Sequence, residues 1–154
     1  MRPEPARVDP ELLRGFPVPR VADDAGKEER GRLLVIAGSR ELAGAAKLAG
    51  IAALRAGAGK LQIGTARSIA APLAVAVPEA RVIGYPETGD GCIAEAGIAP
   101  RVRWAKAAQA GAVGCGMQHG PPLEKLLGRL LDCGAGVPLI LDAAVLDCLE
   151  PLKD

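Results

Sequence analysis

Aromatic side chains are scarce in this 154-residue sequence, which contains one Phe, one Tyr and one Trp. Phe16, Tyr85 and Trp104 lie far apart in the chain, so they form no run of rings on which the bases of a single strand would stack. The sequence also has almost no excess of charge of one sign, because 19 Lys and Arg residues and 18 Asp and Glu residues leave a net charge of +1. A chain without a net field has no general attraction for a polyanion. The composition therefore argues against nucleic acid as a partner.

The chain also lacks a long apolar run and a signal-like beginning. Met1 to Pro5 contain no apolar segment, and the later uncharged stretches are short or interrupted by Gly and Pro. A membrane helix needs about 20 apolar residues, so we expect neither a signal peptide nor a membrane span. The four cysteines show no CxxC spacing, and the single histidine, His119, does not form a recognisable zinc set with them. We therefore expect no metal site, and mostly buried, reduced thiols in a cytoplasmic protein.

Short apolar runs alternate with helical patterns from residue 31 onward, which is typical of βα units in a mainly parallel sheet. Residues 1–30 hold five prolines and no sustained periodicity, so we interpret them as an extended arm before one α/β domain over residues 31–154. Several runs are apolar on both faces, as a sheet covered by helices on both sides requires. The predicted strands are residues 33–37, 61–63, 81–85, 112–113 and 138–141. The predicted helices are residues 44–57, 68–77, 93–109, 121–133 and 143–150.

Glycine-rich turns follow two of these predicted strands. In open α/β sheets ligands bind beyond the carboxyl ends of the strands, so a site is expected at such turns. Gly38 and Ser39 follow the first strand, in a loop that reaches Gly44 at the start of a helix. This loop either holds an anion on its backbone amides or is a plain βα turn. Gly114 and Gly116 follow the fourth strand, and the same two interpretations apply to them.

Two further side chains lie near the ends of predicted strands. Asp142 closes the fifth strand, where a carboxylate either binds a ligand, by accepting hydrogen bonds from sugar hydroxyls or by lying near a metal-bound phosphate, or caps the next helix. The sequence leaves both interpretations open. His119 is the only histidine, and we interpret it as a solvent-facing loop residue rather than a catalytic one.

Taken in order, these motifs resemble the opening of the ADP/ATP-dependent NAD(P)H-hydrate dehydratases, ribokinase-like proteins often described as YjeF-related carbohydrate kinases. The resemblance covers residues 27–148 and rests on several weak motifs in the right order. The segments that carry it are residues 35–40, 44–46, 53–59, 77–79, 113–116 and 141–143. It implies a three-layer α/β/α fold of the ribokinase-like type.

The resemblance also implies an activity, namely repair of hydrated NADH or NADPH by a loss of water that ATP or ADP with Mg drives. A phosphoryl group moved onto the ring hydroxyl would make it a good leaving group, and elimination would restore the reduced ring. No residue of this chain is assigned a catalytic or metal-binding role. The residues that the resemblance places around the hydrated nucleotide are Gly38, Ser39, Gly44, Ala45, Gly114 and Gly116, with Asp142 on the same rim.

The sequence departs from the family pattern in one turn and in length. Cys115 and Gln118 replace the proline and the last glycine of a Gly-Pro-Gly-Leu-Gly turn, and Ala144 and Asp147 alter the segment after the fifth strand. The chain ends at Asp154, just past the middle of a typical family member. The Gly-Asp motif, which in the family supplies the base and the anion hole, is not among these residues. We therefore expect the main ATP or ADP site to lie outside them, and we expect the chain alone to have no dehydratase turnover.

Two alternatives stay open. One is a small-molecule kinase of the same fold that acts on a sugar or vitamin hydroxyl. The other is a non-catalytic nucleotide-binding or assembly module, in which an unpaired sheet edge joins a second copy, giving a homo-oligomer, or a separate partner chain.

Overall fold

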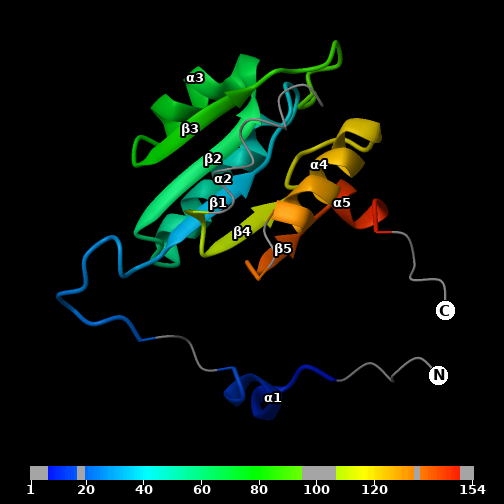
Figure 1. The fold of residues 1–154 in the computed structure, drawn as a ribbon. Helices are drawn as coiled ribbons and strands as arrows, with labels where there is room; N and C mark the ends of the chain where they lie inside the picture. Colours follow the sequence, from blue (N-terminus) through cyan, green and yellow to red (C-terminus); the bar gives the residue numbers. More distant parts are fainter. Residues whose placement is uncertain (1–6, 17–19, 95–106, 134–135, 150–154) are drawn as a thin grey trace.

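Five parallel strands form one sheet in the computed structural model, which describes residues 7–16, 20–94, 107–133 and 136–149 (Figure 1). Their order across the sheet is β3-β2-β1-β4-β5. The strands are β1 (Arg32–Ile36), β2 (Lys60–Ala66), β3 (Ala80–Tyr85), β4 (Ala110–Val113) and β5 (Leu139–Leu141). The helices are α1 (Pro10–Arg14), α2 (Ala43–Arg55), α3 (Arg67–Ala76), α4 (Pro121–Cys133) and α5 (Ala144–Asp147).

Strand β1 lies in the middle of the sheet and is apolar on both faces. Leu34 and Ile36 pack into one buried cluster with residues of α4 and α5, whereas Val35 packs into another with residues of α2 and α3. Alternate side chains of a strand point to opposite faces, so both faces of the sheet are covered. The structure therefore confirms the predicted three-layer α/β/α arrangement with a parallel sheet.

Small residues let α2 approach the sheet closely. A Cβ at Gly50 would lie only 2.7 Å from the Cδ1 atom of Ile63 in β2, so no larger residue fits without displacing that side chain. Ala46 and Ala53 are buried on the same helix. Helix α2 therefore packs closely against β2.

Four predicted helices and all five predicted strands are present; α4 has the predicted limits, and the limits of the others differ. Strand β2 runs three residues beyond the predicted end at Ile63, and α5 ends at Asp147, short of the predicted residue 150. Most of the helix predicted at 93–109 falls on residues 95–106, which lie outside the described part of the chain. At its start the prediction is wrong, because Ile93 forms an antiparallel bridge with Glu87.

The N-terminal residues contain a short helix that the sequence analysis did not predict. The Asp9 carboxylate accepts hydrogen bonds from the amides of Glu11 and Leu12, and so caps α1. No residue of this helix is buried. Further along, the carbonyl of Gly31 accepts hydrogen bonds from the amides of residues 59 and 60. The chain is thus attached to the sheet just before β1, while the division at residues 30 and 31 stays a prediction.

Among the described residues, none of the helices has the length and apolar character needed to cross a membrane. That part of the chain also contains no group of three or more His, Cys, Asp or Glu side chains able to hold a metal ion. Cys92, Cys115 and Cys148 are free thiols, and each is half-buried rather than fully buried. The cytoplasmic location stays a prediction.

Candidate functional site

The two predicted glycine turns meet at the centre of the sheet. The chain crosses from β3 at one edge to β4 on the far side of β1, so the loops after β1 and β4 diverge from neighbouring strands. The amide of Gly38 donates a 2.8 Å hydrogen bond to the carbonyl of Cys115, and the amide of Gly114 donates one of 3.1 Å to the carbonyl of Ile36. Gly38 and Gly116 have φ angles of +82° and +67°, which favour glycine. The first and fourth βα units are therefore neighbours in the sheet.

Asp142 joins this group from β5. A Cβ at Gly114 would collide with the backbone carbonyl of Asp142, so the two turns touch directly. Burial raises the pKa of the Cys115 thiol, and a hydrogen bond with the Asp142 carboxylate raises this pKa further. The helix-capping interpretation of Asp142 is wrong, because Ala143 is the N-cap residue of α5 and no side chain caps it. The Asp142 carboxylate instead faces the thiol of the glycine turn.

The two predicted residues of α2 lie in different surroundings. Ala45 packs against Gly116, where an added Cβ would lie 2.5 Å from the Ala45 Cβ. Gly44 lines a separate groove between α2 and α3, together with Lys47 and Pro72. The structure therefore brings Ala45 next to the glycine turns, whereas Gly44 lies in the groove between α2 and α3.

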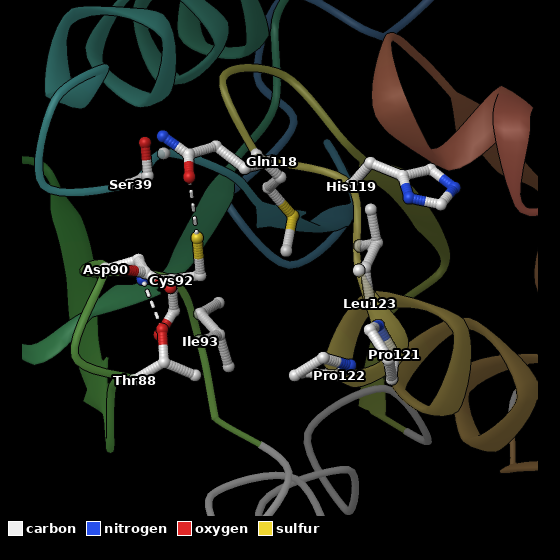
Figure 2. Close-up of a pocket in the computed structure, with 13 residues that line it drawn as sticks. Ser39, Thr88, Asp90, Cys92, Ile93, Gln118, His119, Pro121, Pro122 and Leu123 are labelled. Carbon is white, nitrogen blue, oxygen red and sulfur yellow. Dashed lines mark hydrogen bonds between the residues drawn. The ribbon is translucent and has the colours of Figure 1, made fainter.

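A pocket of about 230 Å³ lies beside the meeting point of the turns (Figure 2). Of the seven predicted site residues, Gly38 and Ser39 line it. The Ser39 side chain is only 1% exposed, and its hydroxyl has no hydrogen-bond partner among the described residues. A buried hydroxyl without a partner is costly, and among the residues that line the pocket Ser39 carries such a hydroxyl. The other lining residues are Thr88, Asp90, Cys92, Ile93, Met117, Gln118, His119, Gly120, Pro121, Pro122 and Leu123.

One wall of this pocket comes from the loop after β3, residues 86–94, which sequence reasoning missed. Thr88 and Cys92 face each other across its turn, where the Cys92 amide donates a 3.2 Å hydrogen bond to the Thr88 hydroxyl. A signal was present, because Pro86 and the glycines at 89 and 91 directly follow a predicted strand. The rule that ligands bind at strand ends applies to this turn as well.

An ion pair holds the 86–94 loop against the loop after β1. The Arg40 guanidinium bonds the Glu87 carboxylate at 2.8 Å and donates a 3.0 Å hydrogen bond to the carbonyl of Gly89. The same carboxylate accepts hydrogen bonds from the amide and the hydroxyl of Ser68, at 3.0 and 2.8 Å. The Arg40 hydrogen bond, followed by those from Ser68, lowers the pKa of Glu87 to about 2. Arg40 and Glu87 therefore fix the position of this pocket wall.

The connection from β4 to α4 supplies the opposite wall. Met117 and Leu123 are buried and give this side an apolar surface. Gln118 reaches toward the 86–94 loop, where its side-chain oxygen accepts a 3.2 Å hydrogen bond from the Cys92 thiol (Figure 2). His119 is exposed, in agreement with its interpretation as a solvent-facing residue.

The charge of the pocket lining bears on what it can hold. The lining includes the Asp90 carboxylate but no Lys or Arg, so it offers no cationic side chain to a triphosphate. The described residues also supply no cluster of carboxylates for Mg²⁺. These residues therefore do not fit ATP with Mg²⁺ in this pocket.

Comparison with known proteins identifies relatives of this chain. Residues 33–154 match the carbohydrate-kinase family model described as NAD(P)H-hydrate dehydratase. The ADP-dependent (S)-NAD(P)H-hydrate dehydratase of Xanthomonas campestris is 42% identical over 144 residues, which cover 94% of this chain and 48% of that protein. The ADP-dependent (S)-NAD(P)H-hydrate dehydratase of Bacillus subtilis is 33% identical, over 80% of this chain and 41% of its own length. The chain thus spans half or less of the length of these curated relatives.

Solved structures agree with this match. The ADP/ATP-dependent NAD(P)H-hydrate dehydratase of Bacillus subtilis, co-crystallised with ATP and Mg²⁺, superposes with a TM-score of 0.64 at 30% identity, over 83% of this chain and 42% of that one. A ribokinase-like superfamily protein from Enterococcus faecalis superposes with a TM-score of 0.70 at 22% identity, over 84% of this chain and 42% of its own. At that identity the second likeness concerns the fold alone. The predicted ribokinase-like fold is confirmed.

Proposed function

Because the chain belongs to the NAD(P)H-hydrate dehydratase family, we propose that its pocket holds the hydrated nicotinamide ring of damaged NADH or NADPH. The observation that carries this proposal is the junction of the glycine turns after β1 and β4, next to a pocket of about 230 Å³. Pockets that enclose drug-sized ligands measure about 300–1,000 Å³. This one is smaller and suits one end of a dinucleotide rather than the whole molecule.

The repair reaction removes the elements of water from the hydrated ring. A hydroxyl group leaves one ring carbon, a proton leaves its neighbour, and the new double bond restores the dihydropyridine. In this proposal the chain binds the ring, orients it and excludes solvent from it. Gly38 lets backbone approach the ligand, Ser39 contributes a hydroxyl, and the apolar wall of Met117 and Leu123 covers a ring face.

The role of ATP or ADP is left to residues other than those of this pocket. Its lining lacks cationic side chains, as described above, so no step of phosphoryl transfer is assigned to it. The kinase alternative gains no support from the named relatives, which are hydrate dehydratases. The proposed task of this chain is therefore binding of the hydrated nucleotide. We expect no turnover from the 154 residues alone.

Two buried hydroxyls provide a matched pair of variants for this proposal. Ser39 and Thr65 are both almost fully buried, and neither hydroxyl has a hydrogen-bond partner among the described residues, but only Ser39 lines the pocket. We expect Ser39→Ala to weaken binding of NADPH hydrate by about tenfold, since one hydrogen bond to the ligand is lost. Thr65→Val should leave the dissociation constant unchanged. Isothermal titration calorimetry measures both.

Turnover is followed separately, as recovery of the absorbance of reduced nicotinamide with ATP or ADP present. Binding of NADPH hydrate without recovery is the expected result. Recovery catalysed by the purified chain would show that these residues are sufficient for the reaction. Absence of binding to the wild-type chain would reject the proposed function.

A further inference from the structure

Gln118 connects three loops that follow three different strands. It lies in the connection after β4, and its Nε2 atom donates a 3.3 Å hydrogen bond to the Glu41 carboxylate in the loop after β1. Its Oε1 atom accepts the 3.2 Å hydrogen bond from the Cys92 thiol in the loop after β3. Figure 2 shows the side chain reaching across one side of the pocket, above Cys92 and close to Ser39. The three segments that surround the pocket thus meet at one amide group.

These two hydrogen bonds are weak ones. A thiol is a poor donor, and Glu41 is exposed, so water competes for its carboxylate. The Gln118 side chain is itself only half-buried. A ligand that offers better partners can therefore replace either bond at small cost. These bonds position the amide of Gln118, and they are weak enough for a ligand to replace them.

The amide also keeps unused hydrogen-bonding capacity. A glutamine side chain has two N–H donors and two acceptor sites on its oxygen, and the contacts described use one of each. It is the only carboxamide side chain among the residues that line the pocket. The neighbouring lining groups, Cys92 and Ser39, are uncharged, so this part of the pocket favours a neutral polar group over a phosphate.

We infer that Gln118 is a specificity-determining residue of the pocket, whose carboxamide recognises an uncharged ligand group carrying both a donor and an acceptor. The carboxamide of a hydrated nicotinamide ring is such a group, because two amides can pair through one N–H···O bond in each direction. This inference rests on the proposed function, since it names the part of the nucleotide that Gln118 reads.

The test compares two probes that differ in the ring. NADPH hydrate carries the carboxamide, whereas 2′-phospho-ADP-ribose is the same nucleotide without the nicotinamide. For the complete 154-residue chain, we expect Gln118→Met to weaken binding of NADPH hydrate about tenfold, because a hydrogen bond to the ligand is lost. The dissociation constant of 2′-phospho-ADP-ribose should stay unchanged. Gln118→Glu, which keeps the size but loses the donors, should do the same. Gln109→Met is the control, because Gln109 accepts a hydrogen bond from the amide of Arg32 outside the pocket.

Alkylation of Cys92 by iodoacetamide, mapped by peptide mass spectrometry, gives a second measurement. NADPH hydrate should slow this reaction in the wild-type chain at least threefold, and 2′-phospho-ADP-ribose should not. Without ligand, Cys92 should be alkylated faster in Gln118→Met than in the wild type, because the thiol loses its hydrogen bond to the Gln118 side chain.

The outcomes separate the two proposals. Equal weakening of both probes, or no weakening of either, in the Gln118 variants overturns this inference while the proposed function stands. If the wild-type chain binds neither NADPH hydrate nor 2′-phospho-ADP-ribose, both the proposed function and this inference are overturned. If Gln118→Met proves unfolded by circular dichroism, Gln118→Glu and the protection of wild-type Cys92 decide the question.

Discussion

At the scale of single residues, the site depends on positions that accept no side chain. Gly114 has a φ of +120°, and a Cβ there would meet the carbonyl of Asp142 and the side chain of Val145. Neither neighbour is free to move, because Asp142 is bonded to β4 through its amide and Val145 is fully buried. Gly114 is therefore required for the turn after β4 to touch the turn after β5.

We expect Gly114→Ala to lower the free energy of unfolding by at least about 2 kcal/mol, since it adds both backbone strain and a steric clash. Gly128→Ala is the matched control. Gly128 is exposed within α4, and a Cβ there meets nothing within 4 Å. The Gly128→Ala variant should have a free energy of unfolding about 0.5–1 kcal/mol higher than the wild type, as a glycine-to-alanine substitution gives in a helix interior. Urea unfolding measures both, and similar effects of the two variants would contradict this account.

The sequence located part of the site because glycine turns after strands are visible in one dimension. Gly38 and Ser39 were predicted from their place after the first strand, and they line the pocket. Cys92 and Gln118 were not assigned to a site, although their side chains meet over it. They are 26 residues apart, and their contact depends on how two loops fold back from strands at different positions in the sheet. Local patterns do not carry that information.

At the scale of elements, Glu87 performs the capping that α3 lacks in its own sequence. The N-cap residue of α3 is Ala66, which has no side chain able to accept a hydrogen bond. Glu87 accepts instead from the first-turn amide of Ser68, and its negative charge suits the positive end of the helix. Because Arg40 holds the same carboxylate, one ion pair connects the end of β3, the start of α3 and the loop after β1.

This connection should be sensitive to acid. The pKa of Glu87 is lowered from 4.5 to about 2 in the folded chain, so the carboxylate stabilises the fold fully above about pH 4.5. This stabilisation is lost as the pH falls from there toward 2. We expect Glu87→Gln to be less stable than the wild type at pH 6, and the difference should shrink as the pH drops toward 2. Urea unfolding at several pH values measures the difference.

The control for this experiment is Glu79→Gln, in which the exposed Glu79 precedes β3. Its stability should follow the wild-type pH dependence. A constant difference between Glu87→Gln and the wild type from pH 6 to 2 would show that the carboxylate charge is not what stabilises the loop.

The limits of strands show why element boundaries were predicted less well than element order. The predicted second strand ends at Ile63, yet β2 continues through Gly64 to Ala66. A Cβ at Gly64 would lie 2.6 Å from the ring of Tyr85 in β3. The glycine is therefore in the strand to make room for a side chain of the neighbouring strand. Tyr85 is 21 positions away in the chain, so the local sequence pattern does not show this contact.

At the scale of the whole molecule, three loops of the described residues form the pocket, and β5 is an edge strand of the sheet that they build. All three loops around the pocket follow strands described here, β1, β3 and β4. The last strand, β5, pairs with β4 and with no other strand of the described residues. The relatives named above are at least twice as long as the part this chain matches.

The open edge should make the 154-residue chain self-associate. Ile140 in β5 is 69% exposed, and Leu131 in α4 and Leu146 in α5 are half exposed, so apolar side chains occur on each element near this edge. An exposed apolar edge strand is a template for pairing with another chain. We expect light scattering to show a mass that rises with concentration, and Ile140→Lys to suppress that rise because a charge on an edge strand opposes pairing. Leu48→Lys, an equally exposed position on α2, should not suppress it. A chain that stays monomeric at all concentrations, or an equal effect of the two lysines, would show that the β5 edge does not drive association.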